Sequence, residues 1–170
     1  MHLVRHNSKP MSLVCIKKST LYGRGVFATQ NIERGQRILT LHGKEIHCVV
    51  KDQETSLAYP NWVGLRKSTW LEVEAPAIYL NHSCNPNAGI RGSRQLIALK
   101  KIKVGEEVTF DYSTTEDDRL WHMKCTCGAK NCRKVVRSIQ FLPVNYFRRY
   151  LPFVPTYFKK VYLQYTDRDA

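Results

Sequence analysis

Four cysteines constrain this chain more than any other feature of its sequence. Three of them form a C-x-C-x4-C run, Cys125-Thr126-Cys127-Gly128-Ala129-Lys130-Asn131-Cys132, and the fourth lies 41 residues earlier, in Asn81-His82-Ser83-Cys84-Asn85-Pro86-Asn87. A structural zinc ion takes four ligands in a tetrahedron, so the three thiolates of the run leave its shell incomplete. Cys84 completes the shell if the fold brings its loop against the run. The spacing therefore predicts that two distant segments meet at a metal site.

Length and composition are those of one folded domain. The chain has 170 residues, of which 43% are hydrophobic and 24% charged, enough for a core without disulfides. No apolar run approaches the roughly 18 residues that a transmembrane helix needs, and Met1-His2-Leu3-Val4-Arg5 is too short and polar to begin a secretory signal. The uneven cysteine spacing favours metal over disulfides and hence a reducing compartment. We therefore expect an intracellular protein, cytoplasmic or nuclear, with no membrane segment.

The net charge of +13 is concentrated toward the two ends of the sequence. Residues 1–51 carry nine Lys and Arg against two acids, residues 133–170 carry eight against two, and residues 52–132 carry ten of each. A well-solvated surface is one interpretation of such a balance. Contact between the basic ends and nucleic acid or a nucleoprotein is the other. Both interpretations stay open on the sequence alone.

Short β-type runs separated by glycine and asparagine predict a mainly β domain. These runs cover residues 13–16, 26–28, 37–41, 70–73, 95–99 and 108–112. Four residues near the C-terminus recur at i, i+3, i+4 and i+7 after Pro155, which predicts a helix with one apolar face: Phe158, Val161, Tyr162 and Tyr165. The sequence thus predicts small sheets followed by C-terminal helices.

Two segments of the sequence also show a weak internal similarity. Four residues of one segment recur 70 positions later in another, namely Ala28, Ile32, Gly35 and Ile38 as Ala98, Ile102, Gly105 and Val108. Both segments have the composition of a strand, a glycine turn and a second strand. This similarity predicts two similar hairpin-like units.

Together these motifs resemble those of the SET-domain protein lysine methyltransferases. Tyr22-Gly23-Arg24-Gly25-Val26 resembles the family's first cofactor segment, and the Asn81 to Asn87 motif resembles its central signature. Glu106-Glu107-Val108-Thr109-Phe110-Asp111-Tyr112 resembles its catalytic strand. The C-x-C-x4-C run resembles the post-SET zinc knuckle, which in that family borrows the cysteine corresponding to Cys84. The resemblance covers residues 14–134, most of the chain.

The resemblance implies a fold of small, mostly antiparallel sheets around a pseudoknot, in which the Tyr112 segment crosses the Asn81 loop. It divides the chain into a flexible arm (1–11), a SET domain (12–114), a post-SET zinc-binding segment (115–134) and a basic, aromatic, helical extension (135–170). One structural zinc ion per chain would be held by Cys84, Cys125, Cys127 and Cys132.

The resemblance also implies that S-adenosylmethionine is the methyl donor and that a lysine in a protein is the acceptor. Tyr22, Gly23 and Arg24 would line the donor site, and Asn81 and His82 would hold the donor's amino-acid and adenine parts. A further set would complete the site: Tyr112 as catalytic and donor-contacting residue, Trp121 as a cover over the adenine or the lysine channel, and Phe110 and Tyr59 as walls of that channel.

Phe110 bears on the number of methyl groups. In the resembled family this position holds tyrosine or phenylalanine, and phenylalanine implies di- or trimethylation. Ile78 stands where many histone-directed members carry arginine. Substrates presented on nucleic acid, such as nucleosomes or ribosomes, would reconcile the positive charge of the chain with a basic acceptor.

Two rival functions remain on the sequence alone. One is a catalytically silent SET module that binds protein or nucleic acid through its basic ends. The other is a hydrolase with a His82–Cys84 nucleophilic pair. The hydrolase would use Cys84 as a nucleophile and leave the cysteine run one ligand short, so we rank it lowest.

Overall fold

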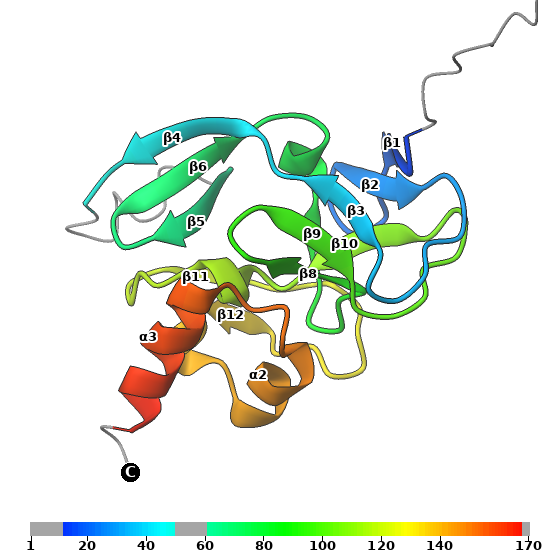
Figure 1. Cartoon of the computed structure of the whole chain (residues 1–170). Coiled ribbons are helices and arrows are strands. Elements are labelled where there is room, and N and C mark those ends of the chain that lie inside the picture. Colours follow the sequence, from blue (N-terminus) through cyan, green and yellow to red (C-terminus); the bar gives the residue numbers. More distant parts are fainter. Residues whose placement is uncertain (1–11, 50–60, 168–170) are drawn as a thin grey trace, which may run out of the picture.

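The computed structural model describes residues 12–49 and 61–167 of the chain (Figure 1). The described part is mainly β, with its strands in four small sheets and its α-helices at the C-terminal end. In Figure 1 most of the strands lie in the upper part of the view and the two C-terminal helices lie in the lower part. The predicted fold class is therefore confirmed. The predicted arm 1–11 and the channel residue Tyr59 fall outside the described residues.

The sheet that carries the central motif joins segments from three parts of the chain. Its strands lie in the order β1 (Val14–Lys18), β2 (Arg24–Ala28), β10 (Glu107–Phe110) and β7 (Asn81–His82). β7 pairs with β10 in parallel, with Asn81 beside Thr109 and His82 beside Phe110, whereas the other pairs are antiparallel. The predicted approach of the Tyr112 segment to the Asn81 loop is thus built into this sheet.

Three smaller sheets complete the β layer. One has the order β3 (Arg37–Thr40), β9 (Gln95–Ala98) and β8 (Ala88–Arg91), and another β4 (Gly43–His47), β6 (Thr69–Val73) and β5 (Trp62–Arg66). The third is the hairpin of β11 (His122–Lys124) and β12 (Val135–Arg137). Each predicted run overlaps a strand, but the last one extends too far, because Tyr112 opens the 3-10 helix η2 (Tyr112–Thr115) instead of continuing β10.

The two similar segments, around Ile32 and around Ile102, make reciprocal backbone contacts with each other. Ile32 and Ile102 exchange hydrogen bonds of 2.8 and 2.9 Å, so the two units meet at equivalent residues. The Gly35 N–H donates to the Ala98 carbonyl, and the Gly105 N–H donates to the Ala28 carbonyl, both at 2.8 Å. The two glycines have φ of +82° and +81°, a conformation that glycine adopts at little cost. The two segments are therefore similar and contact each other, but the prediction of hairpins is wrong, because the strands on either side of each glycine turn lie in different sheets.

Two hydrophobic clusters stabilise the described part. The first lies among the sheets, with Val26, Leu96 and Val108 fully buried. The second surrounds Cys84 and Cys125 and is completed by the C-terminal elements: η3 (Ile139–Phe141), α2 (Val144–Tyr150) and α3 (Thr156–Thr166). The C-terminal extension is therefore packed against the cysteines.

Helix α3 carries the predicted apolar face. Phe158 and Tyr162 are buried, whereas Lys159 and Lys160 are exposed. A Cβ atom on Gly64 of β5 would lie 2.7 Å from Cζ of Phe158, so the lack of a side chain at Gly64 admits the helix. None of the helices in the described ranges is both long and apolar enough to span a membrane.

Candidate active site

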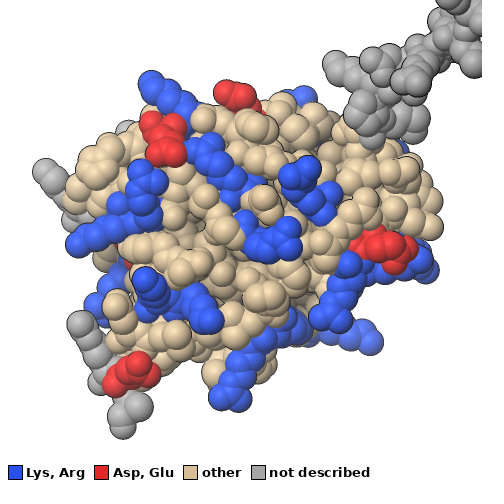
Figure 2. Space-filling view, in the orientation of Figure 1, with Lys and Arg blue, Asp and Glu red and all other residues tan. Residues whose placement is uncertain are grey.

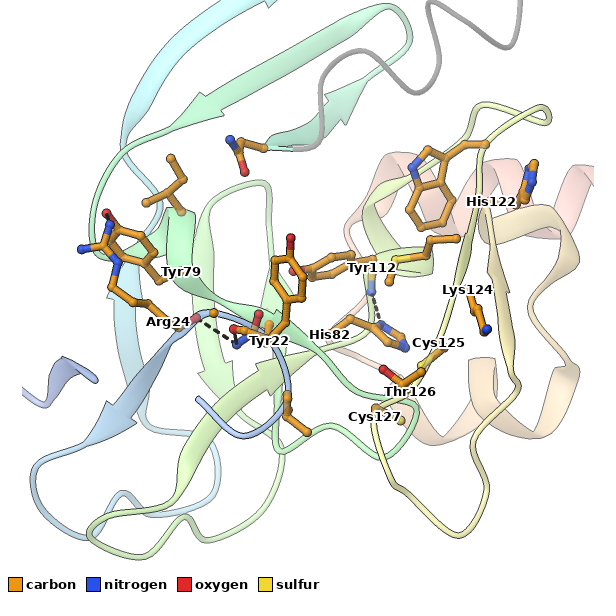
Figure 3. A pocket seen from close by; sticks show the side chains of 17 residues that line it. Tyr22, Arg24, Tyr79, His82, Tyr112, His122, Lys124, Cys125, Thr126 and Cys127 are labelled. Atoms are coloured by element: carbon orange, nitrogen blue, oxygen red, sulfur yellow. Dashed lines mark hydrogen bonds between the residues drawn. The ribbon is translucent and has the colours of Figure 1, made fainter. Parts of the chain in front are cut away.

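A cavity of about 730 Å³ lies where the motifs converge (Figure 3). This volume is within the range of small-molecule sites. Four segments line it: the turn 21–24 that enters β2, the Asn81-His82 strand, Tyr112 and the knuckle residues 121–127. Asn61, Ile78 and Tyr79 complete the lining. The structure therefore brings the predicted donor-site residues around one open cavity.

Tyr112 lies in this cavity with its ring against other aromatic groups (Figure 3). Its hydroxyl donates a 2.6 Å hydrogen bond to the carbonyl of Leu80. The centroid of its ring lies 4.9 Å from that of Phe110 and 5.3 Å from that of His82. Burial, and next the charge of Glu107, raises the pKa of Tyr112 above its ordinary value. The phenol is therefore neutral and held in a fixed direction.

Asn81 links the turn 21–24 to the central sheet. Its side-chain amide donates to the carbonyls of Tyr22 and Arg24, at 3.2 and 3.0 Å, and to the Glu107 carboxylate at 2.7 Å. That carboxylate also accepts from the Ser19 hydroxyl at 2.9 and 2.8 Å. Asn81 therefore shapes the turn through the protein's own backbone, and its contact with a donor stays a prediction.

The two glycines of the turn serve different purposes. Gly23 has φ of +49°, in the left-handed region. Gly25 is needed for close approach, since a Cβ atom there would lie 2.2 Å from Oε1 of Glu107. Gly23 is thus explained by its backbone conformation and Gly25 by the position of Glu107, which the sequence did not identify as a site residue.

His82 joins the Tyr112 segment to the cysteines. Its Nδ1 accepts a hydrogen bond from the Tyr112 N–H at 3.2 Å, so its proton lies on Nε2, 3.3 Å from Sγ of Cys84. Burial lowers the pKa of His82 to about 4, which makes the ring neutral near pH 7. The pair does not form a hydrolase site, because Cys84 is fully buried and lies 3.8 Å from the sulfur of Cys125.

The four predicted zinc ligands are gathered at one point. Their sulfur atoms all lie within 4.8 Å of one another, and all four are free thiols. Zinc–sulfur bonds of about 2.3 Å in a tetrahedron place the sulfurs about 3.8 Å apart. The separation of Cys84 and Cys125 matches that value. The donor set therefore fits a structural zinc ion.

The sequence missed the polar network that surrounds the cysteines. The Asp111 side chain is 1% exposed and accepts hydrogen bonds from Arg133 at 2.6 and 2.7 Å and from the Tyr150 hydroxyl at 2.9 Å. Asp111 sits one residue before Tyr112, and Arg133 one residue after the last cysteine. In the sequence, only their positions beside the Tyr112 motif and the cysteine run could have indicated that these two charged residues contribute to the site.

The remaining predicted residues divide between the rim and the interior. Tyr22 is 83% exposed at the cavity edge, and Trp121 lines the cavity from the knuckle. Phe110 is buried beside Tyr112. Tyr79 was not predicted, yet it lines the cavity with the guanidinium of Arg24 stacked 4.0 Å from its ring centroid.

The acidic run after η2 is part of the interior. Burial raises the pKa of Glu116 to about 8, and the Asp117 carboxylate accepts a 2.6 Å hydrogen bond from the Tyr157 hydroxyl of α3. The Gln140 side chain donates to the backbone carbonyl of Asp117. These contacts anchor the C-terminal extension to the segment that follows η2.

Comparisons with known proteins agree with this geometry. A family model described as the SET domain matches residues 23–113. Histone-lysine N-methyltransferase 2B of Homo sapiens is 31% identical over 136 residues, which cover 71% of this chain and 5% of the relative. Histone-lysine N-methyltransferase trithorax of Drosophila virilis is 32% identical over 137 residues, covering 71% of this chain and 4% of the relative. The chain therefore spans a small fraction of the length of these relatives.

Solved structures share the fold at low sequence identity. The crystal structure of KRYPTONITE in complex with mCHG DNA and SAH superposes with a TM-score of 0.55 and 21% identity, over 72% of this chain and 28% of that one. A structure of ctPRC2 in an autoinhibited conformation bound to S-adenosylmethionine gives a TM-score of 0.52 and 21% identity, over 63% of this chain and 16% of that one. These similarities establish the fold alone.

We predict one zinc ion per chain and its loss on removal of one ligand. Cys127→Ser should lower the zinc content well below one, because three thiolates cannot close the shell. Cys15→Ser is the matched control, since Cys15 is a free cysteine of β1 and should leave the zinc content unchanged. Elemental analysis of the purified variants measures both. Active wild-type protein without zinc would contradict the assignment.

Proposed function

The chain belongs to the SET-domain family, and we propose that it transfers methyl groups from S-adenosylmethionine to the side-chain amine of a lysine in a protein. The observation that carries the proposal is the neutral, oriented phenol of Tyr112 in the cavity formed by the donor-type turn, the Asn81 strand and the knuckle. The names of the relatives, histone-lysine N-methyltransferases, support this reaction and acceptor.

The donor would lie between the turn Tyr22-Gly23-Arg24, the Asn81-His82 strand and Trp121. When bound, S-adenosylmethionine supplies an electrophilic methyl group on a cationic sulfur. Tyr22 is the most exposed aromatic group of the cavity edge and is free to cover a ligand. Asn81 and Glu107 keep the turn in the shape that receives it.

The acceptor lysine must reach the cavity as a neutral amine. An exposed lysine has a pKa of about 10.4, and an apolar channel next to a positive charge lowers it. Phe110 and Tyr112 provide the described part of such a channel, with their ring centroids 4.9 Å apart. Methyl transfer is an in-line displacement, so the orientation of the amine by the Tyr112 phenol carries much of the rate.

A catalytically silent SET module is the rival function. Such a module would bind protein or nucleic acid and would not need the joint arrangement of Asn81, His82 and Tyr112. The hydrogen bonds that fix all three favour the enzyme. Methylation of a protein substrate by wild-type chain with labelled donor distinguishes the two, because the silent module transfers nothing.

We propose a basic nuclear protein, such as a histone carried on nucleic acid, as the substrate, and hence a nuclear location. A chain of net charge +13 repels a free basic peptide but attracts a phosphate backbone. Lysine and arginine side chains spread over the face in Figure 2, with few acids among them. On the sheets, Lys44, Arg37 and Arg91 are exposed, and the nearby Glu45 already pairs with Arg66 and Arg94.

Of these three exposed residues, Arg37 and Lys44 belong to the basic segment 1–51, whereas Arg91 lies in the segment of balanced charge. Neutralising Lys44, Arg37 and Arg91 should weaken duplex DNA binding and reduce its salt dependence. Neutralising Lys17 and Lys18 of β1 together with Lys130 of the cysteine run, all three exposed, is the equal-charge control. Fluorescence anisotropy with a labelled random-sequence duplex measures both. Equal losses in the two variants would show that net charge, and not Lys44, Arg37 and Arg91 in particular, binds the nucleic acid.

We predict that Tyr112→Phe lowers kcat by about a hundredfold or more and changes donor affinity little. The ring remains and only the hydroxyl is lost, and this hydroxyl acts mainly in the transition state.

Asn81→Ala should instead raise the donor KM, because the turn loses its hydrogen bonds to the Asn81 side chain of the central sheet. Tyr165→Phe on α3 is the control. Steady-state kinetics with varied donor concentration measure these effects. A near-normal kcat in Tyr112→Phe would show that Tyr112 only packs against its neighbours and takes no part in catalysis.

We predict that Phe110 permits more than one methyl group per lysine. The rings of Phe110, the last residue of β10, and Tyr112, the first residue of η2, lie with their centroids 4.9 Å apart. Phe110→Tyr adds a hydroxyl to a buried wall, where it would restrict reorientation of a methylated amine. The products should shift toward monomethyl-lysine. Mass spectrometry of exhaustively treated substrate measures this, and wild-type protein that stops at one methyl group would disprove it.

A further inference from the structure

Arg133 contacts the cysteine cluster and the catalytic segment with one side chain. Its Nη2 lies 2.6 and 2.7 Å from the two carboxylate oxygens of Asp111, and its Nη1 donates to the Ser113 hydroxyl at 3.2 Å. Its Nε and its backbone N–H both donate to Sγ of Cys84, at 3.4 Å each. The side chain is 11% exposed, so water competes little for these bonds.

Asp111, which Arg133 binds, stabilises the 3-10 helix that begins with Tyr112. Asp111 accepts the Ser113 N–H at 3.1 Å and thereby caps η2, the 3-10 helix that Tyr112 opens. The Tyr150 hydroxyl donates to the other carboxylate oxygen. A carboxylate this deeply buried requires a cation and several donors. Arg133 is the cation that pairs with it.

Cys84, which Arg133 also binds, lies in the loop that follows β7. The backbone carbonyl of Cys84 accepts hydrogen bonds from Asn131, Arg149 and the Tyr150 hydroxyl, at 3.1, 3.2 and 3.3 Å. Four thiolates around one divalent ion leave a net negative charge, and N–H donors to the sulfurs stabilise such a shell. The two bonds from Arg133 supply that stabilisation at the one ligand that comes from outside the knuckle.

We propose that Arg133 is a positioning residue that couples closure of the cysteine cluster to the placement of the catalytic tyrosine. It binds the sulfur of Cys84 and the carboxylate of Asp111 together, so a shift of either one moves the other. The proposal deepens the proposed function and rests on it for the catalytic readout. An ordinary buried ion pair would affect stability alone, whereas the coupling affects zinc retention and kcat together.

Arg133→Lys tests the coupling, because lysine keeps the charge but cannot reach the sulfur and both oxygens with a planar group. We expect zinc to be released to a colorimetric chelator several times faster, and kcat to fall by about tenfold to a hundredfold. Donor KM should change by no more than about threefold, since the lost contact acts on Tyr112 and not on the donor turn. Arg137→Lys is the matched control, because its guanidinium stacks on the Phe141 ring at 3.6 Å.

Unchanged zinc release or unchanged kcat in Arg133→Lys would overturn the coupling, and so would equal effects in Arg137→Lys. If circular dichroism shows that Arg133→Lys does not fold, Tyr150→Phe replaces it. That variant removes the one hydroxyl proton that the Asp111 carboxylate and the Cys84 carbonyl share, and the same two changes are expected at smaller size. Absence of methyl transfer in the wild type would reject the proposed function, while the zinc-release comparison would still decide the coupling.

Discussion

The architecture of the site depends on the position of one buried sulfur, that of Cys84. This cysteine follows β7, the strand that pairs in parallel with β10, and its sulfur lies 3.8 Å from that of Cys125 in the knuckle. This residue therefore joins the loop that leaves the central sheet to the cysteine cluster. Because residues that line the cavity lie on both sides of this junction, the cavity is complete only when the junction is closed.

The C-terminal extension keeps this junction out of water. Helices α2 and α3 supply Phe147 and Phe158 to the hydrophobic cluster that contains Cys84 and Cys125. Figure 1 shows these helices in the lower part of the view, on the side of the molecule away from β3 and β4. Low polarity around the cluster strengthens each hydrogen bond to its sulfurs and to Asp111. The extension thus contributes to the site without lining it.

The sequence was sufficient for the features that short motifs specify, and insufficient for long-range polar contacts. The four cysteines could be predicted because a tetrahedral shell requires a fourth ligand, and the apolar face of α3 because it repeats with the helical period. Glu107 could not be predicted as the partner of Asn81, since strand pairing brings them together. Arg133 and Asp111 were hidden for the same reason, since 22 positions separate them and only the closed knuckle brings them into contact.

The central claim, that the cysteine cluster completes the donor site, is tested most directly by calorimetric titration with S-adenosylmethionine before and after zinc removal. The account predicts saturable binding to zinc-loaded protein, at least about tenfold weaker binding after chelation, and recovery when zinc is returned. Equal affinity with and without zinc would show that the donor site forms independently of the cluster and would contradict the account.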